Sequence, residues 1–380
     1  MNYFSGLKRR SCCWRTAAAL AVLAVFLPSA FLLAGEIRVV ADRDYWHAIR
    51  PLITGAETSL HFSQLYLNPD RLGNQILSDL ERAAERGVAV TALFNHDPDK
   101  NREPVRRLRE AGAEVVHGGR NAPGRLHAKL VVADRERVLI GSTNWSGASM
   151  YHNREMNVLV SDAKAAGFYA DWIEALQKDP AADPEMTPVE TGGWRTVIDR
   201  EHREIIPDLL GKASQRAWIG LYAFRTYFGT RHEGAVSDRL AKELLRLKKA
   251  GVDVRVIIDK SDYNQLMNRL NRETAEWFQG QGLEVRFNPP GETAHWKLQV
   301  IDDRALVGSM NWGYSGFDLH AEASILLKEP AVVEELAAYF RARWEEAQPL
   351  DPPAASATPA PEGGPVSEET PGAGFSGNVR

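Results

Sequence analysis

The feature that most constrains this 380-residue chain is a pattern of polar residues that occurs twice. The first copy reads LHAKLVVADRERVLIGSTN from Leu126 to Asn144, and the second reads AHWKLQVIDDRALVGSMN from Ala294 to Asn311. Each copy has the order His-x-Lys-x4-Asp, a gap of six or five residues, and then Gly-Ser-x-Asn, and a Glu follows eleven residues after the Asn. With a usage of roughly 5% per residue type, one such match arises by chance about once in 10^7 to 10^8 positions. The repeat therefore predicts two copies of one functional unit.

The histidine and the lysine of each copy are expected on one face of a strand. LHAKLVVAD alternates and is rich in β-branched residues, which predicts a strand, and the alternation places His127 and Lys129 about 6.6 Å apart on the same face. A neutral imidazole beside an ammonium group is suited to attack at phosphorus, because the lysine attracts the phosphate and stabilises its growing charge. The Ser142 hydroxyl and Asn144 can donate hydrogen bonds to the phosphate oxygens. The second copy supplies the corresponding residues His295, Lys297, Ser309 and Asn311.

Glu155 begins another predicted strand and can accept the proton on the second nitrogen of the histidine, which would fix the tautomer and raise basicity. Glu322 has the same place in the second copy. One set cannot both attack a phosphate and protonate a leaving group, whereas two sets that face one phosphate can. Asp134 and Asp302 lie at the turn after each strand, where Asp caps backbone amides, so we expect a structural role for them. We expect no metal and no cofactor, because HExxH motifs and cysteine clusters are absent from the sequence and two lysines would repel a cation.

Strands and helices alternate on both sides of the motifs, which predicts an α/β layered fold. The first half, residues 36–183, has expected strands at 59–67, 88–94, 114–116 and 155–160 and expected helices at 70–86, 103–110 and 163–178. The second half, residues 190–347, repeats this order with strands at 217–225, 251–259, 281–285 and 322–327 and a closing helix at 331–346. This is one duplication with small loop changes, and the Pro and Gly content of residues 180–193 predicts a connector.

With its duplicated His-x-Lys-x4-Asp pattern, the chain resembles the phospholipase D superfamily, whose signature is the repeated HKD motif. The resemblance covers about residues 36–347. It implies two similar tandem α/β sandwich halves related by a pseudo-twofold axis, with mixed sheets flanked by helices and both motifs at the shared interface. It also implies a metal-independent phosphodiesterase in which His127, in the more regular half, forms a phosphohistidine. His295 would then protonate the leaving alcohol and later activate water.

The two copies depart from each other in ways that bear on these roles. The family commonly has Asn two residues before the Glu, and the first copy keeps it as Asn153, whereas the second copy has His320. The gap before Gly308 is also one residue shorter than usual, so a tighter hairpin is expected there. Both differences indicate that the halves are not equivalent.

The first 34 residues predict a signal peptide or an N-terminal membrane anchor. A basic start is followed by an apolar run at residues 16–34, which is long for a signal and near the minimum for a membrane span. In either case the body is expected across the inner membrane, periplasmic or membrane-anchored. Cys12 and Cys13 both precede the apolar run, so the exported body would have no disulfides. Residues 350–380, rich in Pro, Ala, Gly, Ser and Glu, predict a disordered tail.

Net charge and export together favour a lipid substrate. Removal of residues 1–34 takes away four positive charges and changes the net charge from −4 to −8, which weighs against a general nucleic-acid binder. We therefore expect hydrolysis of a phospholipid headgroup ester at a membrane. Three alternatives stay open: an exported metal-independent endonuclease, a cardiolipin synthase-like phosphatidyltransferase, and a non-catalytic phosphate-binding module. An oligomer is not required, because both motifs are in one chain.

Overall fold

The computed structural model of the chain describes residues 36–97, 99–118, 126–260 and 264–350. The predicted signal or anchor and the predicted tail beyond residue 350 lie outside the described residues. Among the helices of the described part, none combines the length and the apolar character that a membrane crossing needs.

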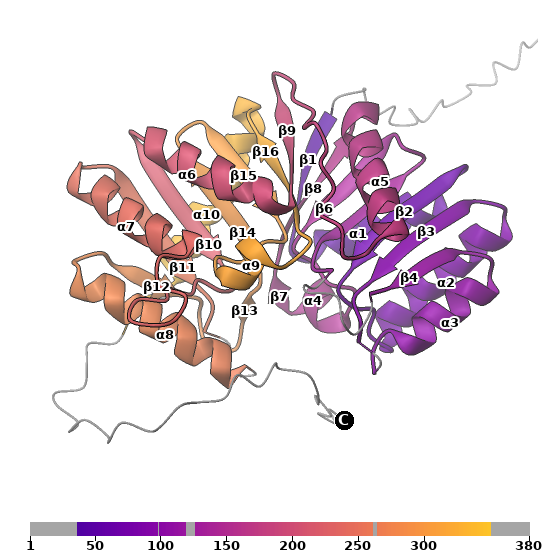
Figure 1. The fold of residues 1–380 in the computed structure, drawn as a ribbon, viewed down its shortest axis with the longest axis horizontal. Helices are drawn as coiled ribbons and strands as arrows, with labels where there is room; N and C mark the ends of the chain where they lie inside the picture. The colour runs from indigo at the N-terminus through magenta and orange to yellow at the C-terminus, as the bar shows by residue number, and fades with distance from the viewer. Residues whose placement is uncertain (1–35, 98, 119–125, 261–263, 351–380) are drawn as a thin grey trace, which may run out of the picture. The chain divides into compact units, whose positions relative to one another are not determined.

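The first half is built on a seven-stranded mixed sheet with the order β1-β8-β6-β5-β2-β3-β4 (Figure 1). β2, β3 and β4 are parallel to one another, and the other neighbouring strands are antiparallel. The strands are β1 (Glu36–Ala41), β2 (Ser59–Gln64), β3 (Ala89–Phe94), β4 (Glu114–His117), β5 (Lys129–Ala133), β6 (Arg137–Gly141) and β8 (Met156–Ser161). The helices are α1 (Asp44–Thr54), α2 (Arg71–Glu85), α3 (Arg102–Glu110), α4 (Gly147–Tyr151) and α5 (Ala163–Lys178).

The second half repeats this sheet strand for strand, in the order β9-β16-β15-β14-β10-β11-β12, and adds β17 at the edge. Its strands are β9 (Trp194–Ile198), β10 (Arg216–Leu221), β11 (Asp253–Ile258), β12 (Val285–Phe287), β14 (Lys297–Ile301), β15 (Arg304–Gly308), β16 (Ala323–Leu327) and β17 (Gln348–Pro349). Its helices are η1 (Asp199–Glu201), α6 (His202–Lys212), α7 (Val236–Lys249), α8 (Gln265–Gly280), α9 (Tyr314–Asp318) and α10 (Pro330–Glu346). The predicted fold of two similar α/β halves with mixed sheets flanked by helices is therefore confirmed.

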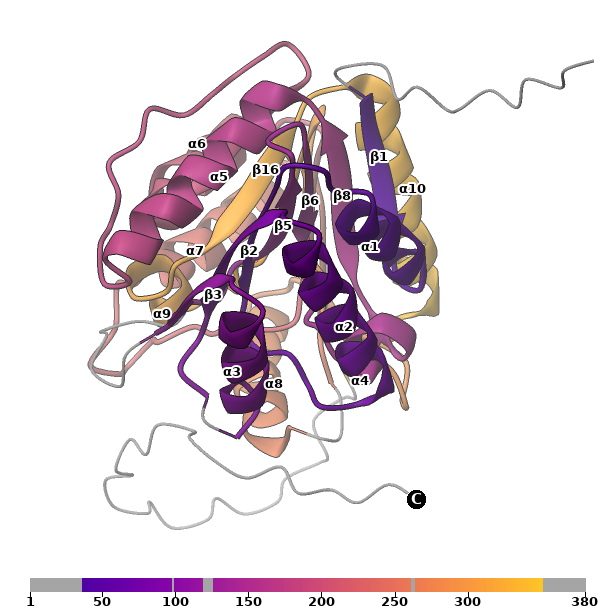
Figure 2. The same ribbon diagram turned by 90° about the vertical axis from the view of Figure 1, so that its right-hand side faces the viewer.

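The halves share one hydrophobic core. Alternate residues of β5 point to opposite faces of its sheet: Leu130 and Val132 enter a central cluster, whereas Val131 and Ala133 enter the outer cluster of the first half. Residues of β14, α5 and α10 also belong to the central cluster, so both sheets bury one face against the same apolar layer. The outer faces are covered separately, and Figure 2 shows α1 and α2 on the side of the first sheet that faces away from α5.

Backbone pairing also joins the halves. The short strands β7 (Asn153–Arg154) and β13 (Thr293–Ala294) come from different halves and form a two-stranded parallel sheet of their own. Each of them immediately precedes a residue of the predicted site, Glu155 or His295. The two motifs are therefore connected by hydrogen bonds as well as by packing.

One detail of the predicted repeat is wrong by a single residue. The match of residues 59–67 with 217–225 pairs Leu67 with Arg225, but the structure gives Phe224 the place of Leu67. Leu67 bridges Trp145, and Phe224 makes the same bridge to Trp312. β10 (RAWIGL) lacks the alternation of apolar and polar residues that β2 (SLHFSQ) has, so the pattern could not fix the register of one strand against the other.

Candidate active site

The predicted histidines and lysines lie at the start of β5 and β14. In the first half the Lys129 ammonium donates a hydrogen bond to the carbonyl oxygen of His127, and Lys297 does the same to His295 at 2.5 Å. Each histidine lies two residues before the first residue of its strand. Both are buried, with 8% of His127 and 7% of His295 exposed. The two lysines are buried still more completely. The motif residues are therefore almost wholly buried, and the imidazoles keep slightly more exposure than the lysines.

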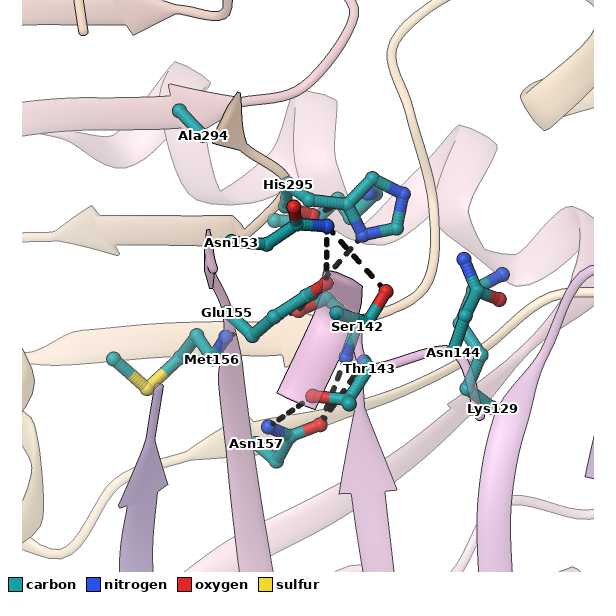
Figure 3. A network of polar contacts seen from close by, with 12 residues as sticks. Lys129, Ser142, Thr143, Asn144, Asn153, Glu155, Met156, Asn157, Ala294 and His295 are labelled. Atoms are coloured by element: carbon teal, nitrogen blue, oxygen red, sulfur yellow. Dashed lines mark hydrogen bonds and ion pairs between the residues drawn. The ribbon is translucent and has the colours of Figure 1, made fainter. Parts of the chain in front are cut away.

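Each histidine is bound by the glutamate of the other half. His127 Nδ1 lies 2.8 Å from Glu322 Oε1, and His295 Nδ1 lies 3.0 Å from Glu155 Oε2. Figure 3 shows the second of these pairs, with Glu155 reaching across to the His295 ring. The prediction that each glutamate serves the histidine of its own copy is therefore wrong: the partners are exchanged.

The backbone explains this exchange. The amide of His295 donates to the carbonyl oxygen of Arg154 at 2.9 Å, and the amide of His127 donates to that of Ala321 at 3.0 Å. Arg154 and Ala321 each directly precede a glutamate of the site. The segment before each glutamate is thus tied to the segment before the opposite histidine, which places the carboxylate beside that ring.

The serines of the motifs hold the glutamates in place. Ser142 Oγ donates to Glu155 Oε2 at 2.5 Å and accepts a hydrogen bond from the amide of Met156 at 3.0 Å. Ser309 Oγ donates in the same way to Glu322. Because each hydroxyl hydrogen is engaged by a carboxylate, it is not available to a phosphate oxygen, contrary to the role predicted for these serines.

The asparagines remain candidates for phosphate binding. Asn144 is buried, and its Nδ2 donates to the Tyr66 hydroxyl over 3.4 Å. The Oδ1 atoms of Asn144 and Asn311 are buried and have no hydrogen-bond partner among the described residues. Buried amide oxygens without a partner, at the same position of both motifs, are candidates for contact with a ligand.

A glycine makes the turn into each serine. A Cβ on Gly141 would lie 2.3 Å from the carbonyl oxygen of Met156, and one on Gly308 would lie 2.0 Å from Ser324 Oγ. These distances exclude any larger residue without a shift of the neighbouring strand. The glycine of the motif therefore serves the close packing of β6 on β8 and of β15 on β16.

The motif aspartates lie away from the imidazoles. Asp134 accepts hydrogen bonds from the backbone amides of Glu57, Thr58 and Ser59 at 2.7 to 3.2 Å. Asp302 accepts them from the equivalent loop of the second half, from Ser214, Gln215 and Arg216. Both carboxylates fix the loop before the neighbouring strand, which is a structural function.

Burial sets the protonation of the histidines and glutamates. It lowers the pKa of His127 to about 3 and also lowers the pKa of His295, so both imidazoles are neutral in the free protein. Burial would raise the pKa of Glu322, but the adjacent His127 and His320 hold it well below its usual value. The pKa of Glu155 is likewise lowered, through His295 and Lys297, against the effect of burial. A neutral imidazole that donates Nδ1–H to a carboxylate has a free electron pair on Nε2.

The lysines link the two half sites electrostatically. Burial lowers the pKa of Lys129 to about 7 and that of Lys297 to about 8. The charge of Lys297 contributes to the fall at Lys129, and Lys129 contributes to the fall at His295. Since charges from both halves act on one another, the two motifs form a single site, and an anion that enters it gains two partners.

Two further aspartates position the glutamates and were missed in the sequence. Asp42 Oδ1 accepts a hydrogen bond from the amide of Glu155 at 2.9 Å, and Asp199 Oδ1 accepts one from the amide of Glu322 at 3.0 Å. Each aspartate follows the first strand of its half, in the similar sequences VADRD and VIDRE. That repeat was a signal that could have found them.

Two buried asparagines that the sequence analysis missed tie the loops behind the site. Asn101 donates to the carbonyl oxygens of Leu65 and Asn95 and accepts from the amide of Leu67. Asn271 makes the same three contacts in the second half, with Tyr222, Asp259 and Phe224. Both lie in an Asn-Arg-Glu triplet, a second repeated signal outside the motifs.

These observations agree with what comparison with known proteins finds. A family model described as "Cardiolipin synthase, PLD-like domain" matches residues 49–177 and 206–344, which are the two halves of the fold. The chain belongs to the phospholipase D superfamily. The predicted resemblance is confirmed, and the matched segments contain both HKD motifs.

Relatives and structures agree with this membership. The chain is 24% identical over 318 residues to a cardiolipin synthase of Staphylococcus aureus, across 76% of this chain and 63% of the relative. It thus spans less than two thirds of that relative's length. Its fold is similar to that of phosphatidylserine synthase from Haemophilus influenzae, with a TM-score of 0.65, 17% identity and coverage of 84% of this chain and 89% of the other. Polyphosphate kinase from Porphyromonas gingivalis has a TM-score of 0.61 at 13% identity, over 83% of this chain and 48% of the kinase.

The residue that differs between the two HKD copies, Asn153 in the first and His320 in the second, lies beside the glutamate of its own half. Asn153 Nδ2 donates to Glu155 Oε1 at 3.2 Å, whereas His320 Nδ1 lies 3.5 Å from Glu322 Oε1. The His320 ring is 5.4 Å from the His127 ring, centroid to centroid. A titratable group thus replaces a neutral amide in one half site only.

His127, His320 and Glu322 are the one group of three in the described part of the chain whose ligand atoms, all within 4.8 Å of one another, could hold a metal ion. Glu322 already binds His127 and Ser309, and the buried Lys129 ammonium stands beside the same imidazole. A cation would have to displace these hydrogen bonds next to a positive charge. The arrangement fits a hydrogen-bonded pair better than a metal centre.

Proposed function

We propose that the protein catalyses phosphatidyl transfer, in which the phosphatidyl group of one phospholipid passes to a hydroxyl group of a second alcohol. The sequence alone favoured hydrolysis of a headgroup ester and kept a cardiolipin synthase-like transferase as an alternative. The relatives of this superfamily member support that alternative better, because the curated protein it matches is named a cardiolipin synthase. The acceptor we propose is a lipid headgroup that ends in a free hydroxyl, such as that of phosphatidylglycerol.

The observation that carries the proposal is the exchange of glutamates between the two histidines. Because Glu322 holds Nδ1 of His127 and Glu155 holds Nδ1 of His295, each ring is held through the opposite half, and among the described residues no hydrogen bond engages its Nε2. Double displacement at phosphorus needs two such rings, one to attack and one to transfer protons.

The first step forms a bond between His127 Nε2 and phosphorus and breaks the bond to the leaving alcohol. An anionic phosphate beside His295 favours its protonated form, so this ring supplies the proton that the leaving oxygen needs. Lys129 and Lys297 stabilise the charge on the non-bridging oxygens. Assignment of the nucleophile to His127 is part of the proposal.

The second step reverses these roles. His295, now neutral, accepts the proton of the acceptor hydroxyl as its oxygen attacks phosphorus, and the bond to His127 breaks. The product is a new phosphodiester, and both histidines return to their starting state. If water takes the place of the acceptor, the product is phosphatidic acid, which is the hydrolysis expected from the sequence.

Burial of the site supports transfer over hydrolysis. With less than a tenth of either histidine exposed, the intermediate would meet little water before an acceptor bound. The lysines and asparagines recognise a phosphate group, and they would serve a nucleic acid equally well. Nuclease activity is therefore one arm of the test.

The test is incubation of the protein, with chelator present, with vesicles of labelled phosphatidylglycerol and separately with labelled single-stranded DNA. We expect a product that contains two phosphatidyl groups, its loss in His127→Ala, and its retention in the exposed-residue control His47→Ala. Phosphatidic acid as the sole product would replace transfer with hydrolysis. Cleavage of DNA alone, again lost in His127→Ala, would make the protein a nuclease.

A further inference from the structure

Each glutamate of the site is held by an aspartate through two backbone contacts. The amide of Asp199 donates to the carbonyl oxygen of Glu322 at 2.8 Å while its carboxylate accepts from the Glu322 amide. Asp42 makes the same reciprocal pair with Glu155. Both aspartates have a left-handed backbone, with φ of 44° and 52°, a conformation that Asp and Asn adopt more readily than most residues. These positions are therefore built to present a side chain to the glutamate.

A helix of the opposite half completes each contact. Trp172 of α5, in the first half, donates its Nε1–H to Asp199 Oδ2 at 2.8 Å. Tyr339 of α10, in the second half, donates its hydroxyl to Asp42 Oδ1 at 2.9 Å. One chain of contacts thus runs from Trp172 through Asp199 and Glu322 to His127, and the other runs from Tyr339 through Asp42 and Glu155 to His295. In each chain the aromatic residue and the histidine belong to one half, and the aspartate and the glutamate belong to the other.

The two chains of contacts differ in charge. Asp42 has a cation beside it, since Arg154 lies 3.4 Å from its Oδ2 and Arg343 acts on it from α10. At Asp199 the residue that corresponds to Arg154 is Ala321.

Among the described residues, no cation is paired with the Asp199 carboxylate. Its carboxylate is buried near the carboxylates of Glu322 and Glu201, and His202 binds its backbone carbonyl oxygen. Glu201 itself is paired with Arg195 at 3.1 Å. The negative charge of Asp199 therefore acts on the Glu322–His127 pair without the compensation that Arg154 gives to Asp42.

We propose that Asp199, held by Trp172, is a positioning residue that raises the proton affinity of His127 through Glu322, an influence that Arg154 cancels for His295. A carboxylate close to a glutamate–imidazole pair favours the proton-bound form of that pair. Two half sites with the same HKD residues are thereby made unequal.

The effect depends on pH in a defined direction. Burial raises the pKa of Asp199 to about 7. Above that pH the carboxylate is charged and supports the proton on His127, and below it the support is lost. The kinetic consequences rest on the proposed phosphatidyl transfer, whereas the ionisation of Asp199 does not.

Infrared difference spectroscopy of the full chain without substrate tests the ionisation directly. Between about pH 5 and 9 we expect a protonated-carboxyl band that disappears with a midpoint near 7, is absent in Asp199→Asn and persists in Asp42→Asn. Asn keeps the left-handed backbone, so the first variant should fold. Trp172→Phe removes a donor to the carboxylate and should move the midpoint upward, whereas Tyr339→Phe should leave it unchanged. The same band in Asp199→Asn, or no titrating band in the wild type, overturns the proposal.

Kinetics test the effect on His127. At pH 8 we expect kcat of Asp199→Asn to fall roughly threefold with KM unchanged, the effect of about one unit in the pKa of a nucleophile at a Brønsted coefficient of about 0.5, and its acid limb near pH 7 to vanish. The exposed-residue control His47→Ala should leave kcat unchanged. A wild-type pH profile in Asp199→Asn contradicts the role. If no lipid is turned over by the wild type, the proposed function fails while the infrared result still decides on Asp199.

Discussion

Burial gives the residues of this site their chemistry. Lys129 and Lys297 are almost inaccessible to solvent, and for that reason the pKa values of both lie well below that of an exposed lysine. The same burial keeps both imidazoles neutral, as nucleophilic attack requires. Such a site is suited to binding an anion. In the free protein, the burial of two lysines without that anion lowers the free energy of unfolding.

Lys129→Met should therefore make the protein more stable and inactive. In the folded state the pKa of Lys129 is about 7, so between that pH and the ordinary lysine value the unfolded chain binds more protons and stability rises with pH. Methionine removes this penalty, which at pH 7 is roughly 4 kcal/mol for a pKa lowered from the ordinary lysine value to about 7, so Tm should rise. Calorimetry at pH 7 and pH 9.5 should show the gain shrinking at the higher pH. A lower Tm at both values would show that the ammonium stabilises the fold.

Anion binding should weaken as pH rises. Lys129 and Lys297 lose their protons around pH 7 and 8 in the free protein, and only the charged forms attract a phosphodiester. Titration calorimetry with diethyl phosphate, which carries one charge throughout, should give a Kd at pH 9 roughly tenfold above that at pH 6. The double variant Lys129→Met/Lys297→Met should show no such trend. An unchanged Kd in the wild type would contradict the role of the lysines.

At the scale of single elements, the site depends on how closely neighbouring strands approach one another. Gly308 ends β15, where a Cβ would lie 2.0 Å from Ser324 Oγ and 2.5 Å from the carbonyl oxygen of Ala323 on β16. Gly308→Ala should cost about 1–3 kcal/mol of unfolding free energy and displace Ser309 from Glu322. Gly167→Ala, on α5 with nothing within 4 Å of the added Cβ, is the matched control and should be neutral or stabilising. Urea unfolding gives the free energy of unfolding of both variants. Equal values for Gly308→Ala and Gly167→Ala would contradict the close packing of β15 on β16.

Most elements could be predicted from sequence, and the failures have physical reasons. Alternation and the repeat located β5, β14 and their neighbours, but β10 is buried on both faces and lacks the alternation of β2, so the pattern could not align these two strands. Asp42 and Asp199 were missed because the contacts that define them are to backbone amides far along the chain. The short repeats VADRD and VIDRE identify Asp42 and Asp199 as equivalent positions only when β1 and β9 are already known to correspond.

At the scale of the whole molecule, the two halves complete each other. The duplicated sequence shows that each half has a histidine and a glutamate. It does not show whether the histidine binds the glutamate of its own half or that of the other half, because both arrangements use the same residues. The parallel pairing of β7 with β13 decides it in favour of exchange. Neither half on its own would have a histidine with its carboxylate partner.

The exchange predicts which histidine each glutamate variant disturbs. In Glu322→Gln, the Nδ1 signal of His127 in 15N-imidazole spectra should shift while that of His295 stays in place, because of these two histidines it is His127 that bonds to Glu322. Glu155→Gln should do the reverse. Disturbance of the histidine in the same half as the mutated glutamate would contradict the structure.

The central claim is that two imidazoles, one from each half, act on one phosphorus atom. The most direct measurement mixes His295→Ala with phosphatidyl-p-nitrophenol, whose leaving group needs no proton, and follows nitrophenolate release together with the mass of peptides quenched in alkali. The account predicts a burst of one equivalent and a phosphatidyl adduct on His127 that persists, because no second imidazole remains to activate an acceptor. Steady turnover without an adduct, or an adduct on a residue other than His127, would contradict it.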